Sequence, residues 1–254
     1  MLREMLASNV YAILLIFARF GAAMMLFPGL NSTTVPVRFR LLLAAMTAFL
    51  VSSSIAGRLP PMPPDFISLL LLIAEEITVG LFFGIVMQVL IMPIDVAGSF
   101  IGYSVGLTNM FTSDPVTAQQ NQLLTGMLNL IAVNVIFLTD SHHLMFQAVV
   151  DSYSLFVPGQ PIPFDDLSQA LWRTASDAML VSFKLAAPSL VFALTFNTGL
   201  ALLNRLVPQM QVFFVGMPMQ ILGGLGILGF CMSPIMTWFL RNFSDGLLAY
   251  MVPR

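Results

Sequence analysis

Six runs of apolar residues, each close to the length that crosses a lipid bilayer, constrain the fold of this chain more than any other feature. A transmembrane helix needs about 17–25 predominantly apolar residues. Inside lipid the backbone must pair its own polar groups, and a helix does so within one segment. The sequence therefore predicts an all-α, polytopic helical membrane protein of about six hydrophobic segments. The runs are residues 11–27, 41–55, 66–92, 123–138, 178–203 and 212–240.

The composition supports this class. Of the 254 residues, 58% are hydrophobic and 9% are charged, whereas a soluble domain carries about a quarter charged residues. A net charge of -2 gives no reason to expect nucleic acid as a partner. The single cysteine, Cys231, excludes an intrachain disulfide. The first twenty residues lack a small-residue cleavage site, so we expect no cleavable signal peptide.

Glycines spaced four residues apart predict close contacts between helices. Gly98, Gly102 and Gly106 fall on one face of a helix, and Gly80 and Gly84 form a GxxxG pair one helical segment earlier. A stripe without side chains lets a second backbone approach closely. We therefore expect a glycine-packed bundle in which these five positions face neighbouring helices.

A segment of helix-breaking residues follows the glycine stripe and ends at Asp114 and Pro115. It contains three bulky apolar residues, Leu107, Met110 and Phe111. An apolar loop in a membrane protein has to be buried in protein or line a cavity, because its backbone cannot face lipid unpaired. Two interpretations remain open here: a re-entrant turn that only packs, or a loop that is delivered to an interior site.

Proline and glycine interrupt several of the runs, which predicts bent or broken helices. Pro93 is expected to interrupt the third run, and Asp95 could then cap the next helix. The last run has a high density of glycine, which favours a bent helix packed closely on its neighbours. The other prolines within runs are Pro188, Pro218 and Pro234.

Polar residues between and within the later runs make further predictions. Residues 141–156 have helical periodicity and are expected to pack on the edge of the bundle. Asp165 and Asp166 are placed to start the helix that leads into the fifth run. Asn129 and Asn134 lie inside the fourth run, where a buried amide predicts hydrogen bonds between helices.

Four charged residues lie inside apolar runs, where an unpaired charge is costly. We interpret Arg19, Glu75, Glu76 and Lys184 as buried charge pairs, with either glutamate as the expected partner of Lys184. Adjacent helical residues point about 100° apart, so at most one of the two glutamates can face a given partner. A proton path through these residues is the alternative interpretation.

No sequence motif indicates catalysis or cofactor binding. The chain has no P-loop, no GxGxxG and no HExxH. His142 and His143 are adjacent, and neighbours on a helix diverge, so we predict no metal site. We expect no cofactor and no enzymatic activity. The alternative function from another class is a stand-alone secondary transporter with a midplane site at Lys184 and Glu75 or Glu76.

Four blocks of sequence, in order along essentially the whole chain, carry a resemblance to a known family. They are FARFGAAMMLFPGL with VPVRFRLLLA, EEITVGLFFGIVMQ, the glycine helix with Asp114-Pro115, and NRLVPQMQVFFVGMP. The last block is the most specific. On these blocks the chain resembles the FliR/SctT family of type III secretion export-gate subunits.

This resemblance implies a core subunit of the flagellar protein export gate, located in the bacterial inner membrane within the flagellar basal body. One copy would join P-type and Q-type subunits in a hetero-oligomer that conducts unfolded proteins across the membrane for flagellum assembly. The B-type switch subunit would be a further partner. Membrane lipid would surround part of the assembly, and no nucleic acid is expected.

The resemblance also assigns regions of the chain. Residues 1–177 would correspond to a P-subunit-like helical part that includes a plug loop at about 106–114. Residues 178–254 would correspond to a Q-subunit-like C-terminal helical hairpin, and the two parts would form one integrated unit. The blocking side chains of the plug would be Leu107, Met110 and Phe111, and the cytoplasmic-side hairpin turn would contain Asn204, Arg205, Pro208 and Gln209.

Overall fold

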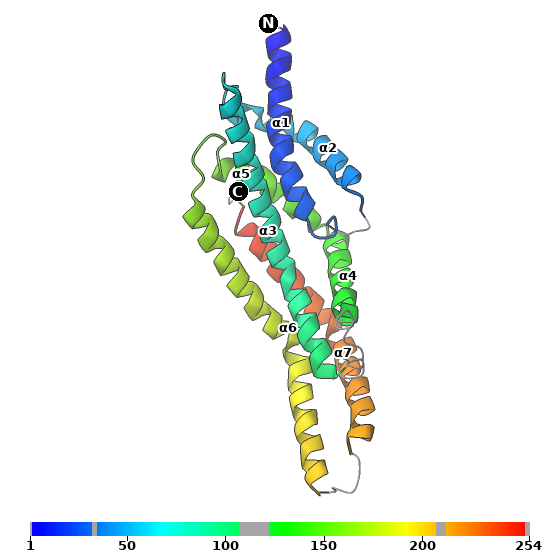
Figure 1. Ribbon diagram of the computed structural model, residues 1–254. Helices are drawn as coiled ribbons and strands as arrows, with labels where there is room; N and C mark the ends of the chain where they lie inside the picture. Colours follow the sequence, from blue (N-terminus) through cyan, green and yellow to red (C-terminus); the bar gives the residue numbers. More distant parts are fainter. Residues whose placement is uncertain (1, 32–34, 107–121, 207–211, 252–254) are drawn as a thin grey trace. The chain divides into compact units, whose positions relative to one another are not determined.

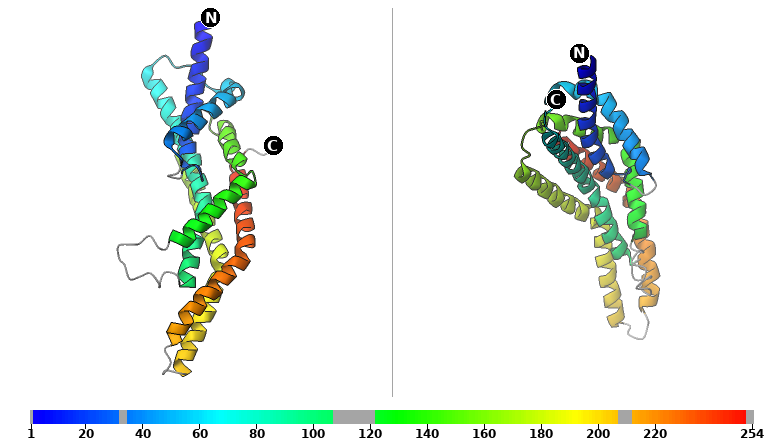
Figure 2. Two further views of the ribbon diagram at one scale, coloured as in Figure 1. Left: turned by 90° about the vertical axis from the view of Figure 1, so that its right-hand side faces the viewer. Right: turned by 45° about the horizontal axis from the view of Figure 1, so that its top comes forward.

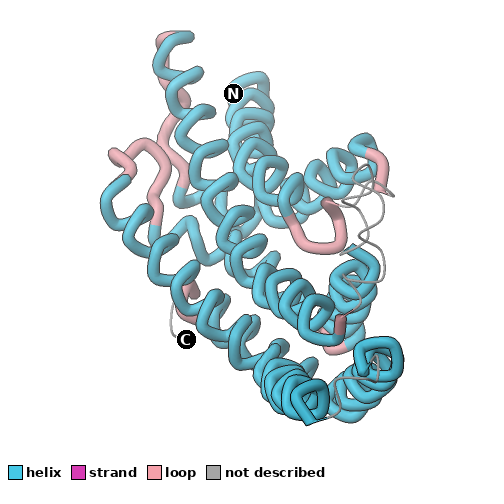
Figure 3. Tube along the Cα trace, turned by 60° about the horizontal axis from the view of Figure 1, so that its bottom comes forward, coloured by secondary structure: helices cyan, strands magenta, loops and turns pink. Residues whose placement is uncertain are grey.

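The computed structural model describes residues 2–31, 35–106, 122–206 and 212–251, and these ranges are helical with connecting loops and no strand (Figures 1 and 3). The all-α prediction is therefore confirmed. The elements are α1 (Leu2–Leu26), α2 (Val37–Ile55), the short 3-10 turn η1 (Ala56–Arg58), α3 (Phe66–Val105), α4 (Gln122–Leu138), α5 (His142–Leu155), α6 (Phe164–Leu206) and α7 (Val212–Leu248).

Five of the described helices are long and apolar enough to cross a membrane: α1, α2, α3, α6 and α7. A sixth candidate span is the pair α4 and α5, which meet at a bend of 72°. The prediction of about six hydrophobic segments in a polytopic membrane protein is thus confirmed. The helix predicted at residues 141–156 is also present, as α5.

The prolines do not break their helices, contrary to the sequence-based expectation. Pro93 lies inside α3, which continues for 40 residues, and α6 and α7 continue through their prolines for 43 and 37 residues (Figure 2). Proline removes one backbone donor, whereas a break exposes several groups that an apolar environment cannot pair. Asp95 consequently lies within α3 and does not cap a new helix.

Two compact units are defined by the contacts within the chain. The first comprises Met1–Leu90, Thr139–Ala175 and Phe243–Arg254, and the second comprises Ile91–Leu138 and Ser176–Asn242. This division differs from the predicted boundary at residues 177 and 178. That boundary concerns likeness to other subunits and stays a prediction.

The first unit is built around the N-terminal part of α3. Helix α1 packs beside α2 and approaches α3 at Gly80 and Gly84. A ring cluster of Phe82, Phe83 and Phe156 with Tyr250 joins α3 to the end of α5 and the C-terminal segment. Fully buried side chains of this core include Leu15, Ile16, Phe20, Met24, Val86, Met87, Val149 and Tyr153.

The second unit contains an antiparallel pair formed by the C-terminal part of α6 and the N-terminal part of α7 (Figure 2). A Cβ at Gly216 would lie 2.7 Å from Leu200 Cδ2, and one at Gly223 would lie 2.6 Å from Phe192 Cζ. Residue numbers therefore increase along α7 while those of the contacting residues on α6 decrease, as expected for an antiparallel helical hairpin. Gly216 and Gly223 therefore serve close packing in a continuous helix.

Candidate functional site

The centre of the first unit holds a buried ion pair between α1 and α3. Arg19 and Glu76 are each 1% exposed. The guanidinium Nε donates to Glu76 Oε2 at 2.7 Å, and Nη2 donates to Glu76 Oε1 at 2.8 Å. Two parallel charge-assisted hydrogen bonds of this kind are the strongest pairing that these groups make.

Helix α5 and the residue that follows it provide the remaining partners of Arg19. Its Nη1 donates to Ser152 Oγ at 3.0 Å, and Nη2 also donates to the carbonyl oxygen of Phe156 at 3.1 Å. The guanidinium carbon lies 3.8 Å from the ring centroid of Tyr153, whose hydroxyl donates to Glu76 Oε2 at 3.3 Å. These contacts tie α1, α3 and α5 together in one cluster.

The glycines of α3 explain why Arg19 can reach Glu76. Gly80 lies one turn after Glu76, and a Cβ there would collide with the backbone carbonyl oxygen of Arg19. Gly84 lies one turn further, and a Cβ there would lie 2.8 Å from Leu26 Cβ. The absence of both side chains lets α1 lie directly on α3, so that the ion pair forms at the contact between the two backbones.

A cavity of about 160 Å³ adjoins the cluster. Its walls are Arg19, Glu75, Glu76, Val79 and residues 155–163, which run from the last residue of α5 through the connector to α6. Glu75 is half-buried, whereas its neighbour Glu76 is buried, as expected for adjacent residues on one helix. Among the described residues, Glu75 makes no ion pair.

The end of α3 in the second unit is fixed to α7. Gln220 Nε2 donates to the carbonyl oxygen of Ser104 at 2.9 Å, and a Cβ at Gly224 would lie 2.6 Å from Val105 Cγ2. The helix then stops at Gly106, whose φ of 83° is readily adopted by glycine alone. The residues predicted to form the plug come next in the sequence, but Leu107, Met110 and Phe111 lie outside the described residues.

Gly98 and Gly102 both face α4 in the second unit, but only Gly98 lies too close to it to leave room for a side chain. A Cβ at Gly98 would lie 2.9 Å from the Cα of Thr125 on α4, whereas a Cβ at Gly102 would lie 3.8 Å from Leu124 Cδ2. Between the same helices, Asn129 Nδ2 donates to Asp95 Oδ1 at 2.6 Å. The interhelical hydrogen bond expected of Asn129 is present, whereas Asn134 donates within α4, to the carbonyl oxygen of Leu130.

Lys184 is not buried, contrary to the sequence-based expectation. It is exposed on α6, and its ammonium lies 5.4 Å from the ring centroid of Trp238 on α7. A lysine stem is long enough to lie along an apolar surface and place the charge over an aromatic face. Glu76, one of its two expected partners, is paired with Arg19 instead.

Two further groups of predicted residues lie at the two ends of α6. Asp165 and Asp166 lie in the first turn of α6, as predicted. Asn204 and Arg205 are exposed in the last turn of α6, whereas Pro208 and Gln209 lie outside the described residues.

Sequence reasoning missed three polar contributors. It placed α5 on the bundle edge, yet Ser152 and Tyr153 are completely buried in the cluster. Their spacing from Met145, Ala148 and Val149 repeats every three or four residues, and this one-sided periodicity was the available signal. Gln220, an isolated amide in an apolar run, was the third.

The fold and this site define a polytopic, all-α membrane protein in which a buried arginine–glutamate cluster joins three helices. Residues 10–246 match the family of bacterial export proteins, family 1. The chain belongs to this family.

Known relatives match this chain along almost its whole length. The flagellar biosynthetic protein FliR of Caulobacter vibrioides is 30% identical over 233 residues, which cover 91% of this chain and 93% of that protein. The FliR of Escherichia coli is 30% identical over 86% of this chain and 83% of its own length. The FliR of Bacillus subtilis is 29% identical over 92% of this chain and 90% of its own length.

These relationships and the apolar helices together define the setting of the protein. It is a component of the flagellar export apparatus and lies in the bacterial inner membrane.

Proposed function

We propose that this chain is a core subunit of the flagellar type III export gate, present in one copy and assembled with P-type and Q-type subunits. Together they form a plugged, gated conduit through which unfolded proteins leave the cytoplasm for flagellum assembly. The chain has no catalytic step in this proposal. The energy for transport comes from other components of the apparatus.

The observation that carries the proposal is the length over which apolar side chains are exposed. On α6 they extend from Phe164 to Leu206, which are 65% and 76% exposed, with Leu194 between them at 73%. Forty-three helical residues rise about 64 Å at 1.5 Å each.

Lipid can cover only part of that length. A helix tilted by as much as 40° crosses a hydrocarbon core of about 30 Å in about 26 residues. Exposed apolar side chains of α6 beyond that length, such as Phe164 and Trp172, are proposed to contact other subunits, because apolar surface in contact with water favours association. Helix α3, with 40 residues and exposed Phe66 and Tyr103 near its two ends, has the same property.

The partners follow from the same surfaces and from the family. Residues 1–177 are proposed to pack as a P-like part and residues 178–254 as a Q-like hairpin, in one integrated unit. The antiparallel pair of α6 and α7 supports the second assignment. The turn after Arg205 is proposed to face the cytoplasm, where the B-type switch subunit docks.

The proposed gate is the loop that follows α3. Gln220 and Val105 hold the end of this helix on α7, so the loop starts from a fixed point at Gly106. Leu107, Met110 and Phe111 are proposed to close the pore, because an apolar constriction that loses its water excludes hydrated ions. An incoming substrate would displace the loop, since Gly106 offers a flexible hinge.

The buried charges are proposed to serve assembly and not proton transport. Both carboxylate oxygens of Glu76 accept hydrogen bonds from Arg19, which leaves this pair committed to the contact between helices. Buried pairs of this kind fix an arrangement more than they add stability.

Deletion of the gene tests the proposal. We expect the deletion strain to retain flagellar proteins in the cytoplasm and to release none of those that are normally exported, with release restored by the intact gene. Normal export in the deletion strain would contradict the proposal. Substrate-dependent uptake by vesicles that contain the purified chain alone would instead support a stand-alone transporter.

A further inference from the structure

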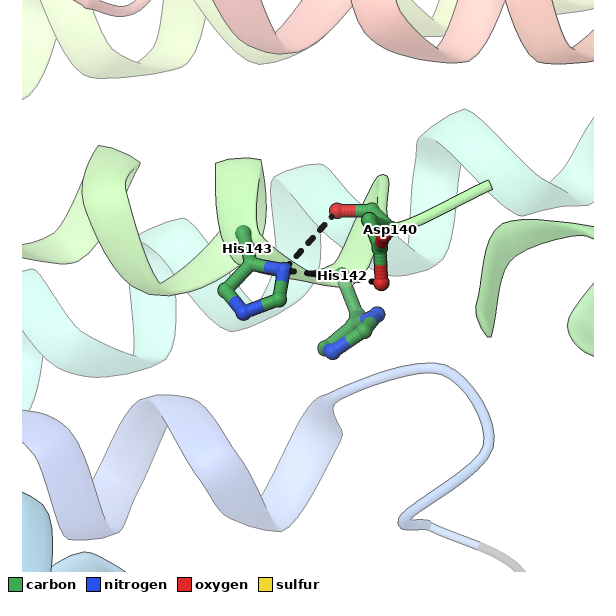
Figure 4. A group of neighbouring side chains, drawn as sticks. All are labelled: Asp140, His142 and His143. Atoms are coloured by element: carbon green, nitrogen blue, oxygen red, sulfur yellow. Dashed lines mark hydrogen bonds and ion pairs between the residues drawn. The ribbon is translucent and has the colours of Figure 1, made fainter. Parts of the chain in front are cut away.

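We propose that Asp140, His142 and His143 form a binding site for a divalent transition-metal ion of the zinc class. The three side chains lie at the start of α5, within the first compact unit (Figure 4). This site is separate from the Arg19 cluster, and the proposal does not depend on the proposed gate.

The three possible ligand atoms converge. One from each residue lies within 4.8 Å of the other two. His143 Nδ1 lies 3.9 Å from Asp140 Oδ1 and 3.2 Å from the carbonyl oxygen of Asp140 (Figure 4). The two imidazole rings are 4.2 Å apart between centroids, so the expected divergence of neighbouring histidines does not occur.

The backbone explains the convergence. Asp140 has a φ of 56°, the left-handed conformation, and no other non-glycine residue in the described ranges has a positive φ. Aspartate tolerates this conformation better than most residues do. The turn brings the Asp140 carboxylate back over the first residues of α5, where the backbone N–H of His143 donates to the Asp140 carbonyl oxygen at 3.0 Å.

The ligand types suit zinc and its neighbours. Imidazole nitrogen and carboxylate oxygen bind Zn²⁺ at about 2.0–2.2 Å, and three protein ligands leave a fourth position for water or another group. Donors around a tetrahedral ion lie about 3.3 Å apart by this geometry. The observed spread of 4.8 Å closes to that value by rotation of the Asp140 and His143 side chains, which are 80% and 72% exposed.

The two rings lie close together, so both imidazoles can present a nitrogen to one ion. The competing explanation is that His143 only closes the turn on Asp140 through its hydrogen bond.

The composition makes the test unambiguous. The chain contains two histidines and one cysteine, so the absorption spectrum of a metal ion with imidazole ligands can arise only from His142 and His143. The full chain, purified in detergent with an affinity tag that contains no histidine, is titrated with Zn²⁺ against a chelating dye. Co²⁺ replaces Zn²⁺ to report the ligand geometry by its visible absorption.

We expect one Zn²⁺ per chain and a Co²⁺ spectrum of low coordination number. Loss of one ligand in His142→Ala, His143→Ala or Asp140→Asn should weaken binding about tenfold or more, equivalent to about 1.4 kcal/mol. Asp140→Gly should weaken it equally while keeping the left-handed backbone, and Asp166→Asn, which removes another exposed carboxylate, should leave it unchanged. No stoichiometric binding, or binding that survives the histidine substitutions, would overturn the proposal and leave a turn-closing role for His143.

Discussion

The guanidinium of Arg19 and the carboxylate of Glu76 meet through two hydrogen bonds, of 2.7 and 2.8 Å, at a place where neither side chain reaches solvent. The pair lies where the backbone of α1 rests on Gly80 of α3. Close packing of glycine and pairing of charge are therefore two parts of one contact. Variants at Arg19, Glu76 and Gly80 test this contact.

Arg19→Met should strongly destabilise the first unit. It leaves the Glu76 carboxylate buried without its counter-charge, which costs about 3–5 kcal/mol. For a chain of this size, that loss lowers the unfolding temperature by about 6–20 °C. Thermal unfolding of the purified protein in detergent measures the effect.

A second variant separates charge from shape. Arg19→Met combined with Glu76→Gln removes both charges and keeps an amide that can accept from Tyr153. We expect the double variant to be more stable than Arg19→Met alone, because no charge is left buried. Losses that simply add in the double variant would show that the two residues do not act as a pair.

Gly80→Ala should separate α1 from α3. The added methyl group meets the backbone of Arg19, which cannot move aside as a side chain can. We expect a loss of about 1–3 kcal/mol of unfolding free energy. Gly126→Ala, in a helix where nothing lies within 4 Å of the new Cβ, should be neutral or slightly stabilising. Equal stability of the two variants would rule out the close contact.

Gly98→Ala and Gly102→Ala should behave differently although both residues belong to one stripe. The first places a methyl group 2.9 Å from the Cα of Thr125, and the second places it at an ordinary distance of 3.8 Å from Leu124 Cδ2. We expect Gly98→Ala to lose about 1–3 kcal/mol and Gly102→Ala to change stability little. Denaturant titration of the two variants side by side distinguishes them, and the reverse order would contradict the structure.

The plug proposal predicts an ion leak. Met110→Ala combined with Phe111→Ala should leave assembly intact and raise membrane conductance severalfold, because smaller side chains leave room for water in the constriction. Met62→Ala with Phe66→Ala removes an exposed residue of each type elsewhere and should leave conductance unchanged. Conductance equal to that of the unmodified protein in the Met110 and Phe111 variant would count against a plug at this loop.

Much of the architecture could be predicted because hydropathy and glycine spacing are local properties of the sequence. The apolar runs indicated the membrane helices, and the Gly80–Gly84 pair marked a helix contact that the structure contains. The prolines misled, since a sequence shows the lost hydrogen bond at Pro93 but not the cost of breaking a helix in an apolar environment.

Partner choice among the charged and polar residues could not be predicted. Glu76 could have paired with Lys184 or with Arg19, and only the register of α1 on α3 decides for Arg19. Asp95, expected to cap a helix, accepts a hydrogen bond from Asn129 instead, because α3 continues past it to Val105. Such choices depend on which helix faces come together, and a single sequence does not contain that information.

Native mass spectrometry of this chain, co-expressed with candidate P-type and Q-type subunits, tests the export-gate proposal most directly. We expect one copy of the chain in a large hetero-oligomer that stays together after transfer from detergent. A chain that appears alone or as a homodimer, while the P-type and Q-type subunits assemble without it, would contradict the export-gate assignment.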